Sequence, residues 1–227
     1  MDPLNLLKIV TTITTAIIAL IIGLRILSLN RRDLLNVWFT LYFMTSSSGF
    51  IFYAVYHLIF NNANIIIPLM ITAQILFNLN SISLIMTVFA LEQYSQIAMS
   101  VKYFGTMTVV FFVMTIGYFL FPPYLDMGDY ALDIVNTHTP PGLFIFVNAI
   151  RLLLAIYAVL RYIIITKKLE GKTKKKVKWF ILGVLVLIMG LFTNLLGGLL
   201  SLIVVEVVAL IIVDIGAILV FKGFLIK

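Results

Sequence analysis

Long apolar runs separated by short polar segments make up most of this chain of 227 residues. An α-helix rises 1.5 Å per residue, so about 20 apolar residues cross the hydrocarbon core of a bilayer. On this rule the pattern predicts a seven-helix transmembrane bundle, an all-α membrane protein forming one domain. The predicted spans cover residues 4–29, 34–60, 65–91, 103–121, 142–166, 177–197 and 199–221. The last two are divided at Gly197–Gly198, because a single run of roughly 40 apolar residues is too long for one tilted helix.

The polar segments between the runs predict an orientation. Lys167–Lys178 reads KKLEGKTKKKVK and holds seven lysines against one acid, which is typical of a cytoplasmic loop because Lys and Arg resist translocation. The segment 122–141 has three aspartates and no Lys or Arg. Basic segments therefore alternate with non-basic ones, and we expect the N-terminus outside and the C-terminus in the cytoplasm of a cell membrane. The 122–141 loop would form a lid over the bundle or, alternatively, contact a ligand or cation.

Composition supports a lipid environment. Of all residues, 63% are hydrophobic and 11% are charged, against roughly 25% charged in soluble domains. The net charge of +7 is explained by membrane topology, and no nucleic-acid-reading motif accompanies the lysines, so no nucleic-acid partner is expected.

The sequence has few residues or motifs suited to cofactor binding or catalysis. The chain has no cysteine and two histidines, His57 and His138, which argues against thiolate metal sites and bis-histidine haem. The last span carries no lysine for a retinal Schiff base, and no metalloprotease, nucleophile-elbow or phosphate-loop motif occurs. We expect no cofactor, no metal and no enzymatic activity.

Two parts of the chain resemble each other. Leu24-Arg25 precedes Trp38-Phe39, with Gly49 eleven residues past the tryptophan; Leu160-Arg161 precedes Trp179-Phe180, with Gly190 eleven residues past that tryptophan. This spacing predicts parallel repeats of spans one to three and five to seven around a central fourth helix. The alternative is ordinary membrane anchoring, since Trp and Phe beside basic loops are common at interfaces.

Ionisable groups inside the apolar spans are costly and are therefore candidates for function. Arg151 lies roughly 13 Å and Glu206 roughly 10 Å below the outer surface, so the two could form an ion pair. Asp214 lies about 12 Å deeper than Glu206, where amides of the third span are its expected partners. The predicted ligand-binding residues are Arg151, Glu206, Asn148, Asn78 and Gln74, and Asp214 and Asn80 are further intramembrane polar residues.

These polar groups allow two interpretations. In one, they are interhelical hydrogen bonds that hold the bundle together. In the other, they line an outward-facing pocket for a ligand or ion.

The layout resembles the seven-helix N-terminal sensor region of histidine kinases. Two segments carry the similarity: the basic entry to the sixth span, KKVKWFILG (Lys175–Gly183), and the end of the seventh, GAILVFKGFL (Gly216–Leu225). The resemblance implies a sensor; because no kinase or dimerisation domain follows, it also implies that the output is a separate protein.

The sequence thus favours a non-enzymatic receptor or sensor-like module that signals through a protein partner in the membrane or at 167–178. A structural subunit of a larger membrane complex is the main alternative. A small transporter built from 3+1+3 repeats is a second alternative, which needs a cavity at the midplane near Asp214 and Asn80.

Overall fold

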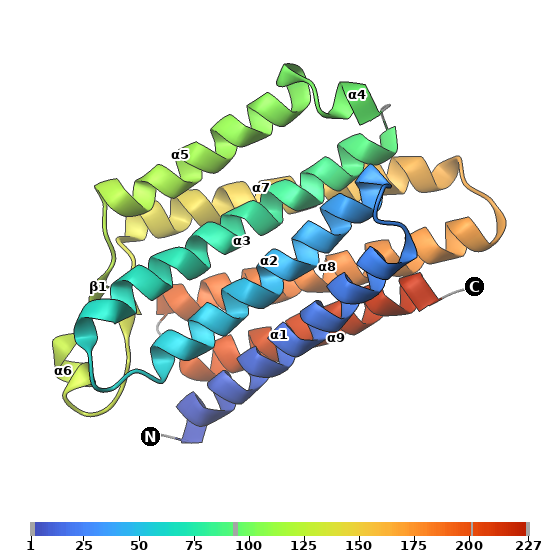
Figure 1. Ribbon diagram of the computed structural model, residues 1–227. Coiled ribbons are helices and arrows are strands. Elements are labelled where there is room, and N and C mark those ends of the chain that lie inside the picture. The colour runs from blue at the N-terminus through green and yellow to red at the C-terminus, as the bar shows by residue number, and fades with distance from the viewer. Residues whose placement is uncertain (1–2, 93–94, 201, 226–227) are drawn as a thin grey trace.

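The computed structural model describes residues 3–92, 95–200 and 202–225 and shows a bundle of long helices (Figure 1). The long helices are α1 (Pro3–Leu29), α2 (Leu34–His57), α3 (Ala63–Glu92), α5 (Thr106–Leu120, preceded by the π-helical segment η1, Val101–Gly105), α7 (Pro141–Lys167), α8 (Gly171–Leu200) and α9 (Ile203–Leu225). The short elements are α4 (Ser95–Ala98), β1 (Tyr124–Leu125), α6 (Met127–Tyr130) and β2 (Thr137–His138).

Within the described residues, six helices are long and apolar enough to cross a membrane: α1, α3, α5 with η1, α7, α8 and α9. The chain is therefore a multi-pass helical membrane protein. Helix α2 has 24 residues but carries four consecutive hydroxyl side chains, Thr45–Ser48, which lower its mean hydropathy. One of them, Ser47, donates a hydrogen bond to the Ala16 carbonyl oxygen of α1 at 2.8 Å.

The helices form two layers of three. Helices α1, α2 and α3 pack side by side in one layer, and α7, α8 and α9 pack side by side in the other. The layers join at both edges, where α3 packs on α7 and α1 packs on α9. In the middle, the Phe39 ring of α2 contacts the Phe180 ring of α8, with centroids 5.1 Å apart. Side chains from both layers thus fill the interior.

Helix α5 lies outside these two layers, against α3 and α7 (Figure 1). Its buried residues are Met114, Thr115 and Tyr118, while many of its other side chains are exposed. The prediction of a central fourth helix is therefore wrong. The apolar pattern of α5 fits lipid on most sides, and hydropathy alone does not distinguish a lipid-facing helix from a central one.

The two ends of the bundle differ. The end that carries β1, α6 and β2 is called the hairpin end, and the end that carries Lys167–Lys178 is called the lysine end. Strands β1 and β2 pair antiparallel, with Tyr124 opposite His138. This segment packs on α2 and α3, since Val135 and Leu125 contact a cluster around Tyr56. It therefore covers the tips of two helices.

Two predicted boundaries at the α7–α8–α9 region are wrong. The basic segment 167–178 is not a loop, because α7 continues to Lys167 and α8 begins at Gly171. Lysine is a good helix former, so α8 extends beyond its apolar part. Gly197 and Gly198 do not separate the last two helices either, since α8 continues through them to Leu200 and α9 begins at Ile203. Gly197 instead allows close packing: a Cβ there would lie 3.0 Å from the Glu206 backbone nitrogen.

The layers match what parallel repeats would produce. A two-fold axis along the bundle would exchange α1 with α7, α2 with α8 and α3 with α9. The corresponding residues Phe39 and Phe180 contact each other, as residues on such an axis must. Gly49 of α2 faces Phe77 of α3, and Gly190 of α8 faces Val213 of α9. The helix arrangement is thus compatible with duplication.

Candidate functional site

The Arg151 side chain lies between α7 and α3. It is on the face of α7 that also carries the buried residues Val147 and Ala155, so helical spacing directs it inward. Its Nε and Nη2 donate to the Asn78 side-chain oxygen at 3.0 and 2.7 Å. Nη2 also donates to the backbone and side-chain oxygens of Gln74, both at 3.0 Å. Nη1 reaches the Asn148 side-chain oxygen at 3.4 Å.

The same amides connect α5 to the bundle. The Tyr118 hydroxyl donates to the Gln74 side-chain oxygen at 3.2 Å. The Asn78 amide nitrogen donates to the Thr115 hydroxyl at 3.3 Å. Four of the five predicted ligand-binding residues, namely Arg151, Asn148, Asn78 and Gln74, therefore form one network across α3, α5 and α7. We call this network, with Tyr118 and Thr115, the Arg151 cluster.

The fifth predicted residue, Glu206, lies elsewhere, and its predicted ion pair with Arg151 is wrong. Its carboxylate pairs with Lys8 of α1, whose Nζ lies 2.5 Å from Oε2. Helix α9 is the neighbour of α1 and α8, whereas Arg151 points toward α3. The two side chains were placed at similar depths, but depth does not determine which helices are neighbours.

The Lys8–Glu206 pair is mostly shielded, with side chains 10% and 18% exposed. Lys8 Nζ also lies 5.3 Å from the ring centroid of Tyr53. Sequence reasoning missed this pair because it assigned Arg151, not Lys8, as the partner of Glu206. The pair could have been suspected from the sequence, because Lys8 and Glu206 each lie within a few residues of the N-terminal end of their helix.

Asp214 and Asn80 have partners other than those predicted. The Asp214 carboxylate accepts a hydrogen bond from the Thr15 hydroxyl of α1 at 2.5 Å, not from amides of α3. The Asn80 amide nitrogen donates to the Tyr42 carbonyl oxygen of α2 at 2.7 Å. The two residues therefore belong to different interfaces and do not share a midplane site.

A second ion pair lies near the lysine end. Arg161 of α7 binds Glu92 of α3 through two hydrogen bonds of 2.8 Å, in the two-pronged geometry typical of Arg and carboxylate. Sequence reasoning did not single out either residue, although both occur where an apolar run ends.

The Arg151 cluster contains no carboxylate. No Asp or Glu occurs in α2, α5, α7 or α8. Helix α3 has one acid, Glu92, which is engaged by Arg161. Within the described residues, the Arg151 charge is thus held by neutral groups: the amide and backbone oxygen atoms and the Phe77 ring, whose centroid lies 5.9 Å from Arg151 Cζ.

A small cavity and a larger groove lie beside the Arg151 cluster. A small cavity of about 30 Å³ lies between α2, α3, α7 and α8 and has Arg151, Asn80, Ser81 and Tyr42 among its lining residues. A larger groove of about 510 Å³ lies between α5 and α7 and is lined by apolar side chains such as Val113 and Phe146.

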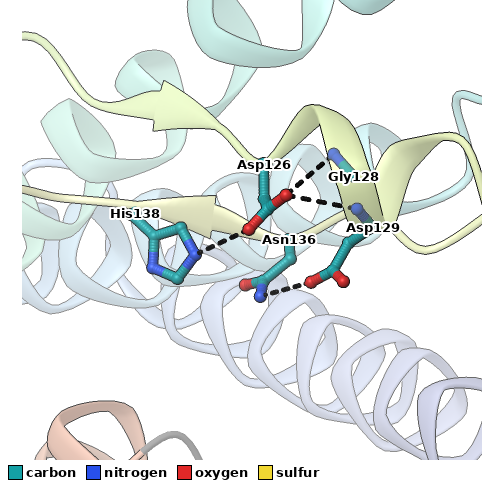
Figure 2. Close-up of polar contacts among 5 residues, drawn as sticks. All are labelled: Asp126, Gly128, Asp129, Asn136 and His138. Atoms are coloured by element: carbon teal, nitrogen blue, oxygen red, sulfur yellow. Dashed lines mark hydrogen bonds and ion pairs between the residues drawn. The ribbon is translucent and has the colours of Figure 1, made fainter.

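The hairpin-end segment is organised by its own side chains (Figure 2). Asp126 caps α6 by accepting from the Gly128 and Asp129 backbone nitrogens at 2.9 and 3.2 Å. Its other oxygen lies 3.8 Å from His138 Nε2, and Asn136 donates to the Asp129 carboxylate at 2.9 Å. These acids are used to shape the segment, and within the described part of the chain no group of three His, Asp or Glu side chains could hold a metal ion.

No family model, curated protein or solved structure matches the chain.

Proposed function

We propose that the chain crosses the membrane seven times, because α2 crosses it in addition to the six apolar helices. We place the hairpin end outside and the lysine end in the cytoplasm. The distribution of basic residues supports this orientation, since most of them lie in the helix ends and connections at the lysine end. Those residues are Arg25, Arg31, Arg32, Lys102, Lys167, Lys168, Lys172, Lys174, Lys175, Lys176, Lys178 and Lys222.

We further propose a non-enzymatic receptor or sensor-like role, with the Arg151 cluster as the sensing site and a separate protein at the lysine end as the output. One observation carries this proposal: a partly buried cation without a carboxylate partner lies on α7, the helix that ends in the basic segment. Helix α7 runs unbroken from Arg151 to Lys167, roughly 24 Å away. A change in the contacts of Arg151 would move or rotate this helix and so reach the lysine end.

A fluorescent label tests this coupling. The natural chain lacks cysteine, so Thr173→Cys in the exposed first turn of α8 gives a single labelling position at the lysine end. We expect Arg151→Gln to change the emission of an environment-sensitive dye at position 173 in lipid nanodiscs. Leu153→Ala, a lipid-facing change two residues away on α7, is the matched control and should leave the emission unchanged. Equal emission in all three proteins would contradict the proposal.

A structural subunit of a larger membrane complex is the second candidate. The filled interior favours it, because the cavity beside Arg151 has about 30 Å³ and ligand pockets usually exceed roughly 300 Å³. The same small volume disfavours a transporter with a substrate site at the midplane. Native mass spectrometry from gentle membrane extracts separates the first two candidates: membrane subunits in fixed stoichiometry would support the structural role.

A further inference from the structure

The small cavity beside Arg151 has a specific size. Its volume of about 30 Å³ exceeds the roughly 10–15 Å³ that one water molecule needs, so it holds one or two small species. It is far too small for a phosphate ester, an amino acid or a sugar. Any ligand in it must be about the size of a single atom or a few atoms.

Residues that line this cavity have hydrogen-bond donors to spare. An arginine side chain has five N–H groups, and Nη1 of Arg151 has one contact, to Asn148 at 3.4 Å, for its two. Asn80 uses one N–H for the Tyr42 carbonyl oxygen and keeps a second. Among the described residues, the Tyr42 hydroxyl has no hydrogen-bond partner either. Several donors and one fixed positive charge thus surround the space.

The partly buried Arg151 charge also lacks an acidic partner there. Arginine does not release its proton in proteins, so burial cannot neutralise Arg151. By contrast, the buried Lys8 has a carboxylate partner in Glu206. The four helices around the cavity contribute one acid, Glu92, which Arg161 already engages. A cation that is partly removed from water and has no counter-charge is destabilising, because the low dielectric of its surroundings solvates it poorly.

We propose that the cavity binds one monovalent anion of halide size, such as chloride, against the Arg151 guanidinium. This inference deepens the proposed function, on whose sensing site it rests, by naming the class of ligand. The anion supplies the missing negative charge and accepts the spare N–H and O–H donors. Occupancy would then fix the position of α7 relative to α2, α3 and α8.

The test uses the purified full chain in nanodiscs made of zwitterionic lipid. Sodium chloride and sodium bromide are compared with sodium gluconate and sodium sulfate at equal ionic strength. We expect chloride and bromide to raise the midpoint of thermal unfolding in a saturable manner, by about 5–10 °C at 100 times the dissociation constant. Gluconate and sulfate, which exceed the cavity, should give no increase. Broadening of the ³⁵Cl resonance by the protein, reversed by bromide, should report the binding directly.

Variants separate this site from general salt effects. Arg151→Gln keeps hydrogen-bonding capacity toward Asn78 and Gln74 but removes the charge, so it should abolish both responses. Ala155→Val keeps Arg151 and narrows the cavity that Ala155 lines, so it should also abolish them. Arg161→Gln removes a different arginine of α7 and should retain them.

Three results would overturn the inference. The first is an equal unfolding midpoint of the natural chain in chloride and in gluconate. The second is a chloride response that survives in both Arg151→Gln and Ala155→Val, and the third is a chloride response that Arg161→Gln abolishes as fully as Arg151→Gln does. Anion binding is measured without any partner protein, so its failure is distinct from failure of the label assay at position 173. If the dye still reports Arg151→Gln while chloride has no effect, the sensor role stands with a different ligand.

Discussion

At the scale of single residues, the buried Lys8 and the partly buried Arg151 have different kinds of partner. Lys8 on α1 meets a carboxylate of α9, and Arg151 on α7 meets amide oxygens of α3. These two interfaces, α1 with α9 and α7 with α3, would be exchanged by the two-fold axis between the layers. The two interfaces that this axis would relate therefore hold a complete ion pair in one case and a cation without a carboxylate partner in the other.

We expect the Lys8–Glu206 pair to show strong coupling. Glu206→Gln should destabilise the bundle by about 3 kcal/mol, because it leaves the shielded Lys8 charge without its partner. The double variant Lys8→Met/Glu206→Leu should recover most of that loss, since it removes both charges. Unfolding in mixed micelles of increasing denaturing detergent measures the free-energy differences. A double variant no more stable than Glu206→Gln would show that the pair is not coupled.

The sequence predicted which polar residues share a helix face better than it predicted their partners on other helices. Arg151, Asn148, Asn78 and Gln74 could be grouped from the sequence, since helical periodicity places Gln74 and Asn78 on one face of α3 and Asn148 and Arg151 on one face of α7. The partner of Glu206 could not be predicted. Distance along a helix gives depth in the membrane, but the order of helices around the bundle depends on packing between segments far apart in the sequence.

At the scale of helices, glycine positions determine how closely α8 and α9 approach. A Cβ added at Gly183 would lie 2.6 Å from the Val220 backbone nitrogen and 2.8 Å from the Gly216 carbonyl oxygen. Backbone atoms cannot rotate away as side chains do, so any substitution there must separate the two helices. The sequence suggested instead that glycines in this region mark a turn.

We expect Gly183→Ala to destabilise the bundle by about 1–3 kcal/mol through this overpacking. Gly142→Ala in the first turn of α7 is the control, since a Cβ there meets no atom within 4 Å. The same detergent titration compares the two. Equal midpoints for both variants would show that α8 and α9 tolerate a wider separation.

Helix α5 should be only weakly attached. Tyr118→Phe removes the hydrogen bond to Gln74, and such bonds in membranes contribute about 0.6 kcal/mol on average. The stability of the two layers should therefore change little. Cross-linking between cysteines placed at Thr115 and Asn78 should become less efficient in the Tyr118→Phe background, with Tyr157→Phe, at an exposed site on α7, as the control. Unchanged efficiency would mean that apolar contacts alone hold α5.

At the scale of the whole molecule, the number and direction of crossings can be tested by labelling. Single cysteines at Asn30, Asn61, Ala131 and Thr173 occupy four exposed connections or helix ends. In intact cells, we expect a membrane-impermeant maleimide to label positions 61 and 131 and to leave 30 and 173 unlabelled until the cells are opened. Labelling of 30 and 61 from the same side would show that α2 does not cross the membrane.

The overall architecture was predictable to a large extent, because membrane spans follow from length and apolarity. The predicted bounds of the first, third, fourth and fifth spans agree with the helices to within about two residues. Packing was not predictable: α5 lies at the periphery, and the first and last helices are neighbours. In a membrane helix, hydrophobicity does not distinguish the face that contacts lipid from the face that contacts protein. Small residues and buried polar pairs therefore determine the arrangement of the helices.

The contact between the first and last helices has a consequence for biosynthesis. Lys8 is synthesised about 200 residues before its partner Glu206. At about 5–20 residues per second, the lysine waits roughly 10–40 s for its counter-charge. During that time α1 must remain beside the translocation machinery or keep its amine near the lipid head groups. The bundle can therefore close only after α9 has been synthesised, and a nascent chain stalled before α9 should be a substrate for membrane quality control.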